Sequence, residues 1–213
     1  MDILIITFAI IIVLIGVYQY KKALKRKRAV RIDSYQFPKS IPEKIIKTYP
    51  HLSEEQVNQV MSGLREYFHI CNLAGRKMVA MPSQAVDLAW HEFILFTKHY
   101  ELFCKHCLGR FLHHTPAEAM STPTLAQDGI KRVWRISCHR EVISPIKPKQ
   151  LPMLFAMDAS LKIPDGFNYS LNCKHKNQSG YCASHIGCGG GCTGDSGGSS
   201  CGSSCGGGCG GGD

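Results

Sequence analysis

The sequence predicts a mostly α-helical protein with an N-terminal transmembrane helix, a compact helical domain and a disordered tail rich in glycine and cysteine. Three observations predict this organisation. Residues 3–18 carry no charge, the middle of the chain repeats apolar residues at helical spacing, and most of the 21 glycines fall in residues 187–213. The expected segments are an anchor over 1–20, a basic juxtamembrane connector over 21–42, a helical domain over 43–175 and a low-complexity tail over 176–213.

The first segment has the length and charge pattern of a membrane anchor. From Ile3 to Tyr20 the chain would form about 27 Å of helix, close to the thickness of a hydrocarbon core of about 30 Å. Asp2 precedes this run, whereas six basic residues follow it: Lys21, Lys22, Lys25, Arg26, Lys27 and Arg28. A cleavable signal peptide has the opposite order. The positive-inside rule therefore predicts a single-pass protein of the cell inner membrane, with its N-terminus outside and its C-terminal domain in the cytoplasm. The alternative is a buried helix of a soluble domain.

The net charge of +9 belongs mostly to this basic cluster, so no nucleic acid partner is expected. The expected partner is the membrane itself, and an unidentified protein partner stays open. In a reducing cytoplasm, the 11 cysteines are expected as core thiols, metal ligands or redox groups rather than as disulfides. The opposite orientation would place the body outside the cytoplasm and reverse this prediction.

Helix signals follow one another through the body of the chain. The sharpest is a capping box, in which Ser53 and Gln56 satisfy each other's backbone amides and open a helix that Gly75 ends. Before it, Pro38 and Pro42 mark a connector over residues 29–42. The other helices are expected over 43–49, from Ser83 to Gly109, from Thr115-Pro116 onward and over about 123–140, with short helix or strand in the proline-rich stretch 143–172.

Two familiar kinds of metal or redox site are considered in the long central helix. His91 and Glu92 open the string HEFIL, which lacks the second histidine of the HExxH zinc-protease motif. Cys104 and Cys107 form a C-x-x-C pair, which could be half a zinc site or a redox pair. On a helical wheel both fall on the apolar face, so the sequence favours core thiols.

The candidate metal site consists of Asp87, His91, His113 and His114. Asp87 and His91 lie four residues apart, where a carboxylate and an imidazole can share a hydrogen bond or a metal ion. His113 and His114 follow the glycine turn after that helix. The expected cofactor is zinc or another soft or borderline transition metal. The same residues could instead form the acid–base cluster of an enzyme, or a polar network that ties the helix to the turn.

The tail offers a second set of candidate ligands. Five of its cysteines are separated mostly by glycine and serine, and the last three recur at intervals of four: Cys188, Cys192, Cys201, Cys205 and Cys209. Thiolates on such a chain could wrap soft ions, although glycine linkers preorganise nothing. Incidental cysteines in a low-complexity extension are the alternative. Upstream, Cys173, His175, Cys182 and His185 fit no tight zinc signature.

The strings VDLAWHEFILFTKHYELFCKHCLGRFLHHTP, WRISCHRE and LPMLFAMDASLKIPDGFNYSLNC, followed by a glycine–cysteine tail, resemble a bacterial family grouped with the glycine-rich domain-containing proteins. The resemblance spans roughly residues 40–175. Larger plant relatives repeat a DxxWHxH element, in which a second histidine stands where this chain has Phe93. The resemblance implies a domain boundary and no activity.

No nucleophile elbow, phosphate loop or dinucleotide fingerprint occurs in the sequence. The sequence therefore favours a membrane-anchored binding or scaffold module with metal-binding capacity over an enzyme. The alternative is a metal-dependent or acid–base enzyme that uses the cluster of Asp87, His91, His113 and His114.

Overall fold

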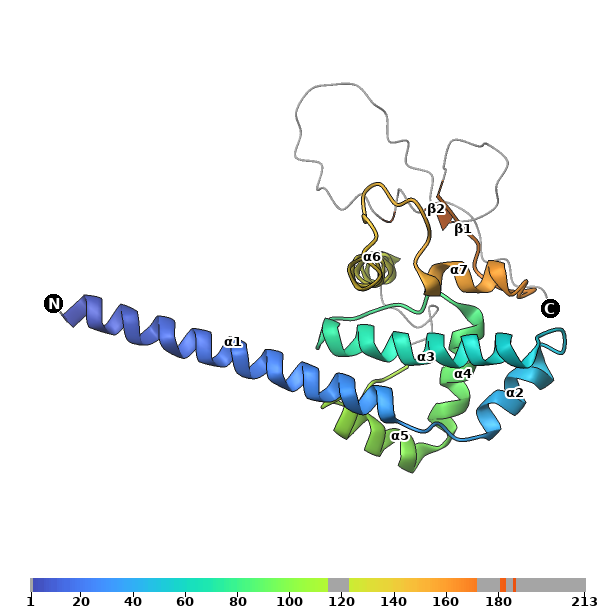
Figure 1. Ribbon diagram of the computed structural model, residues 1–213, viewed down its shortest axis with the longest axis horizontal. Helices are drawn as coiled ribbons and strands as arrows, with labels where there is room; N and C mark the ends of the chain where they lie inside the picture. Colours follow the sequence, from blue (N-terminus) through green and yellow to red (C-terminus); the bar gives the residue numbers. More distant parts are fainter. Residues whose placement is uncertain (1, 115–122, 172–180, 183–185, 187–213) are drawn as a thin grey trace, which may run out of the picture.

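The computed structural model describes residues 2–114, 123–171, 181–182 and 186, and it shows one long helix that projects from a group of shorter ones (Figure 1). The mostly helical class predicted from the sequence is confirmed. The Thr115-Pro116 signal and the cysteine-rich tail lie outside the described residues. The elements are α1 (Asp2–Ser34), α2 (Ser40–Thr48), α3 (Glu54–Ala74), α4 (Gln84–Leu95), α5 (Thr97–Phe103), the π-helical turn η1 (Cys104–Leu108), α6 (Pro123–Arg140), α7 (Met153–Ser160) and two short strands paired in parallel, β1 (Tyr169–Ser170) and β2 (Tyr181–Cys182).

Helix α1 is a single uninterrupted helix with two different halves. Its large apolar side chains from Leu4 to Tyr20 are exposed, and the helix is long and apolar enough to cross a membrane. The sequence predicted a connector from residue 29 onward, but the helix continues to Ser34. The reason is local, because residues 21–34 are rich in Lys, Arg and Ala and contain neither glycine nor proline.

The second half of α1 is bound to the domain by polar contacts with α3 and η1. Lys25 Nζ donates a hydrogen bond to the carbonyl of Leu73 (2.8 Å), and Asn72 Nδ2 donates to the carbonyl of Lys25 (2.9 Å). One turn and a half later, Arg31 donates to the carbonyl of His106 (2.9 Å). Lys25 and Arg31 lie about 120° apart around the helix, so α1 contacts the domain through a broad face.

Arg65 of α3 closes the C-terminal end of α1. Its guanidinium donates to the carbonyls of Ile32, Asp33 and Tyr35, the last two over 3.0 and 2.9 Å. A helix C-terminus leaves such carbonyls without intrahelical partners. The same guanidinium lies 5.0 Å from the centre of the Phe37 ring. One arginine thus fixes both the end of α1 and the segment that follows it.

Helix α2 begins earlier than the sequence predicted, at Ser40. Pro42 was expected to prevent a helix, but proline is tolerated in the first turn, where its missing N–H would have no partner. Ile41 and Ile45 are fully buried on its inner face.

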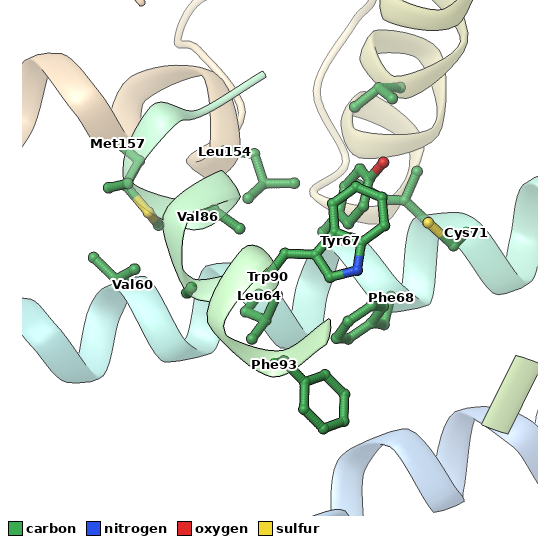
Figure 2. Packing of buried hydrophobic residues seen from close by; sticks show 14 of the residues in the cluster. Val60, Leu64, Tyr67, Phe68, Cys71, Val86, Trp90, Phe93, Leu154 and Met157 are labelled. Atoms are coloured by element: carbon green, nitrogen blue, oxygen red, sulfur yellow. The ribbon is translucent and has the colours of Figure 1, made fainter. Parts of the chain in front are cut away.

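Helix α3 is the centre of the core. The predicted capping box is present, since the Ser53 backbone amide donates to Gln56 Oε1 (2.9 Å) and the Gln56 amide donates to Ser53 Oγ (3.3 Å). Gly75 ends the helix with a φ of 65°. Figure 2 shows the buried face of α3 packed against α4 and α7, through Val60, Leu64, Tyr67, Phe68 and Cys71 on α3, Val86, Trp90 and Phe93 on α4, and Leu154 and Met157 on α7.

The prediction of one continuous helix from Ser83 to Gly109 is wrong. The chain turns at Phe96 (φ −80°, ψ 59°) and divides this stretch into α4, α5 and η1. The rings of Phe93 and Phe103 show the consequence. Ten residues of straight helix would separate them by about 15 Å along the axis, whereas their centroids are 5.3 Å apart. The turn folds α5 back so that both rings enter one aromatic cluster.

A buried carboxylate fixes the start of α4. Asp158 of α7 accepts hydrogen bonds from Ser83 Oγ (2.6 Å) and from the backbone amides of Gln84 (2.7 Å), Ala85 (3.3 Å) and Phe167 (2.9 Å). The first amides of a helix have no intrahelical partner and favour negative charge. Asp158 therefore joins α7, α4 and the loop before β1.

Helix α6, which spans the predicted range, is joined to α3 by a two-pronged ion pair. Arg140 donates to both carboxylate oxygens of Glu66, over 2.5 and 2.7 Å. Trp134 in the same helix is fully buried, and its Nε1 donates to the carbonyl of Pro145 (3.0 Å).

Candidate metal centre

The first two residues of the candidate site lie on the same face of α4. Asp87 stands in the first turn, where its backbone amide donates to the carbonyl of Ser83 (2.9 Å). His91 follows one turn later, with its Nδ1 3.3 Å from Asp87 Oδ2. The four-residue spacing predicted this contact, because side chains at i and i+4 are neighbours on a helix.

His114 reaches the same carboxylate from a separate segment. Its Nε2 lies 3.2 Å from Asp87 Oδ1, and its ring centroid is 4.1 Å from that of His91. The edge of the Trp90 ring system packs against His114 at a centroid distance of 4.7 Å. Among the described residues, Asp87, His91 and His114 form a group whose potential ligand atoms all lie within 4.8 Å of one another.

His113 is not brought into this group. It is exposed, and its ring lies 4.8 Å from the ring of Phe111. Neighbouring residues in an extended segment point to opposite sides. His114 therefore faces α4 while His113 faces away from it.

Tyr100 holds the segment that carries His114, and sequence reasoning missed this residue. Its hydroxyl donates to the carbonyl of Leu112 over 2.5 Å, and Trp90 Nε1 donates to the Tyr100 oxygen over 3.2 Å. Burial raises the pKa of Tyr100, so the hydroxyl keeps its proton for this bond. No sequence signal could have found this contact, because it requires α5 to fold back at Phe96.

The arrangement suits a transition metal ion. Donor atoms bound tetrahedrally to zinc at about 2.0–2.1 Å are separated from one another by about 3.3–3.4 Å. Asp87 Oδ2 lies 3.3 Å from His91 Nδ1, and the other carboxylate oxygen, Oδ1, lies 3.2 Å from His114 Nε2, so each separation is close to that value. Two imidazoles and one carboxylate are also a known zinc ligand set that leaves a fourth position open. His91 is exposed, so that position would be reachable from solvent.

Four cysteines of α3, η1 and α6 have a different environment. Cys71, Cys104, Cys107 and Cys138 are free thiols, and all are buried. Burial raises the pKa of Cys71 to about 12 and those of Cys107 and Cys138 to about 11. Burial also raises the pKa of Cys104. Both members of the C-x-x-C pair thus lie in the environment expected of core thiols.

These thiols give a prediction about pH. In an unfolded chain these thiols ionise near the ordinary pKa of 9.0, whereas the folded chain holds the protons of Cys71, Cys107 and Cys138 to about pH 11 or above. The folded state therefore binds more protons over this range, and its stability is expected to fall as pH rises from about 9 to 11. At pH 8, iodoacetamide is expected to label these four cysteines only after denaturation, which peptide mass spectrometry measures. Rapid labelling of Cys104 or Cys107 in the folded chain would contradict this.

The other ligands considered from the sequence cannot be placed in this way. The tail cysteines Cys188, Cys192, Cys201, Cys205 and Cys209 lie outside the described residues, as do Cys173, His175 and His185. Their metal-binding capacity stays a prediction.

Comparison with known proteins places the chain in a protein family. A family model described as UCP032817-like matches residues 27–189, most of the chain, and the chain therefore belongs to this family. The match begins inside α1, in the part of that helix that packs on the domain. No significant match is found among curated proteins or among solved structures.

Proposed function

We propose that this member of the UCP032817-like family is a single-pass membrane protein whose cytoplasmic helical domain binds a transition metal ion, such as zinc, through Asp87, His91 and His114. It would act as a binding or scaffold module. The observation that carries the proposal is the convergence of these three donors, from two separate segments, within 4.8 Å.

The proposed topology rests on α1. Its exposed apolar half precedes the basic residues, which favours an N-terminus outside the inner membrane and a domain in the cytoplasm. The helix also continues without interruption into contacts with α3 and η1, so the anchor and the domain form one unit. A cleavable signal peptide is removed from the mature protein, so it would not be expected to continue into a helix that packs on the domain.

Support for metal binding comes from the way the site is built. Asp158 fixes the start of α4, and with it the position of Asp87. Tyr100 fixes the carbonyl of Leu112, and with it the approach of His114. Ligands that are held by surrounding contacts bind a metal more tightly than ligands on free segments.

The test uses the full chain with the five tail cysteines (188, 192, 201, 205 and 209) replaced by serine, so that tail thiolates do not contribute. Calorimetric titration in mild detergent is expected to show one zinc ion per chain. Asp87→Ala, His91→Ala and His114→Ala should each weaken binding by more than about 100-fold, since even changes around ligands cost about 10–100-fold.

His113→Ala is the matched control, because this neighbouring histidine faces away from the group and should leave the affinity unchanged. The absorption of bound Co²⁺ should show nitrogen and oxygen ligation without thiolate bands. Absence of stoichiometric zinc binding, or equal affinities in all four variants, would contradict the proposed site.

A second candidate function, an acid–base enzyme, is favoured by one observation. His114 Nε2 and His91 Nδ1 both contact the Asp87 carboxylate, and His91 is exposed to solvent. A carboxylate that orients an accessible imidazole is a common general-base arrangement. Ester hydrolysis that persists in a chelator and disappears in His91→Ala would favour this candidate over the metal centre.

A further inference from the structure

The basic half of α1 fixes two loops of the domain close to the end of its apolar run. Lys25 Nζ holds the carbonyl of Leu73, where α3 ends. Arg28 lies so close to Gly109, which follows η1, that its guanidinium occupies the space a Cβ would need. In Figure 1 the C-terminal end of α3 lies beside the last third of α1, where that helix meets the domain.

The positions of Lys25 and Arg28 along α1 give the distance of these loops from the hydrocarbon core of the membrane. Lys25 lies five residues after Tyr20, which is about 7.5 Å of helix. The headgroup region adds about 5–8 Å to each side of the hydrocarbon core. When the apolar run spans the core, the loop at 73–77 lies at the boundary of the headgroup layer. The loop at 109–111, held beside Arg28 about 12 Å beyond Tyr20, begins a few Å further out.

The composition of these loops suits that location. Arg110 joins them, because its Nε donates to the carbonyl of Gly75 over 2.7 Å. Leu73 and Phe111 are 36% and 47% exposed, although both are large and apolar. No Asp or Glu occurs between residues 67 and 86 or between 102 and 117. We name the exposed set the juxtamembrane face: Leu73, Arg76, Lys77 and Phe111.

We propose that the juxtamembrane face binds the anionic headgroup layer of the same membrane that α1 crosses. Arg76 and Lys77 would pair with lipid phosphates, while Leu73 and Phe111 enter the boundary between headgroups and acyl chains. This contact gives the domain a second attachment beside the helix and fixes its orientation to the bilayer. The inference rests on the proposed membrane anchor.

The test places a fluorescent probe on the face. Phe111→Trp is prepared in the full chain and reconstituted into vesicles of phosphatidylcholine and phosphatidylglycerol whose phosphatidylcholine is brominated near the headgroup. The native Trp90 and Trp134 are buried and supply the background, which the wild-type chain measures. Leu95→Trp, at the exposed junction of α4 and α5, is the matched control. Quenching of the added probe is expected to be at least about twofold stronger in Phe111→Trp than in Leu95→Trp.

Charge is tested in the same assay. The added quenching should decrease with Arg76→Gln plus Lys77→Gln, and in vesicles without phosphatidylglycerol, but not with Lys98→Gln plus Lys162→Gln. Equal quenching of the two tryptophan probes in a chain that floats with the vesicles overturns the juxtamembrane face alone. A wild-type chain that fails to float with vesicles overturns the anchor as well.

Hydrogen exchange provides a second measurement on the wild-type chain. Exchange at residues 73–77 and 109–111 is expected to be slower in anionic than in neutral vesicles.

Discussion

Replacing Asp158 by alanine is expected to lower the free energy of unfolding by about 3–5 kcal/mol, the cost typical of removing one partner from a buried charged network. The carboxylate is only 2% exposed and accepts four hydrogen bonds. Without it, the hydroxyl of Ser83 and the amides of Gln84, Ala85 and Phe167 lose their acceptor in a place that water reaches poorly. Urea unfolding in mild detergent, followed by tryptophan fluorescence, measures the change.

The matched control for this variant is Asp165→Ala. Asp165 is exposed and accepts one hydrogen bond, from the Tyr49 hydroxyl (3.1 Å). Its loss should cost less than about 1 kcal/mol, as is usual for exposed polar contacts. Similar unfolding midpoints for the two alanine variants would show that Asp158 does not hold α4 as the geometry indicates. Asp158→Ala should also weaken zinc binding, because Asp87 stands in the first turn of α4.

Phe93→Ala is expected to destabilise the domain by about 3–5 kcal/mol, the range for deleting a buried aromatic side chain. Phe93 is fully buried at the centre of the aromatic cluster. Its ring centroid lies within 5.2 to 6.1 Å of the rings of Phe37, Phe103, Tyr100, Tyr35 and Phe68. The cavity would remove the ring that the segment after α1, helix α3 and helix α5 all pack against. The same urea titration measures the loss.

Leu95→Ala, two residues further along α4, is the control. Leu95 is exposed, so its truncation should change the stability by no more than about 0.5 kcal/mol. Phe93→His is also informative, since it tests the second histidine of the DxxWHxH element that the sequence was expected to resemble. Residues 91 and 93 lie about 200° apart around a helix. The new imidazole would therefore enter the core and should destabilise the domain without adding a zinc ligand.

Local features of this fold were predictable where the sequence alone determines them. The capping box at Ser53 and the end of α3 at Gly75 were predicted correctly because both depend on backbone hydrogen bonds within a few residues. The Asp87–His91 contact was predictable for the same reason. The apolar run of α1 could be predicted from its length and its hydropathy alone.

Features that depend on distant contacts were not predictable. The turn at Phe96 contains no glycine or proline, and it is stabilised by contacts between Phe93, Phe103 and rings from other helices. A helical wheel drawn through that turn placed Cys104 and Cys107 correctly inside, although the straight helix on which it relied is absent. Equally, nothing in the adjacent pair His113-His114 indicated which ring would face Asp87, because Tyr100 decides it through Leu112.

The unbroken course of α1 has a mechanical consequence. Ser34 lies 14 residues beyond Tyr20, so the helix forms a rigid arm of about 21 Å between the apolar run and the core. If α1 crosses the membrane as proposed, a change in tilt of about 20° would displace the far end of this arm by about 7 Å. Bilayer thickness, which sets helix tilt, would then act on the position of the whole domain. Headgroup contacts beside the arm would resist that rotation.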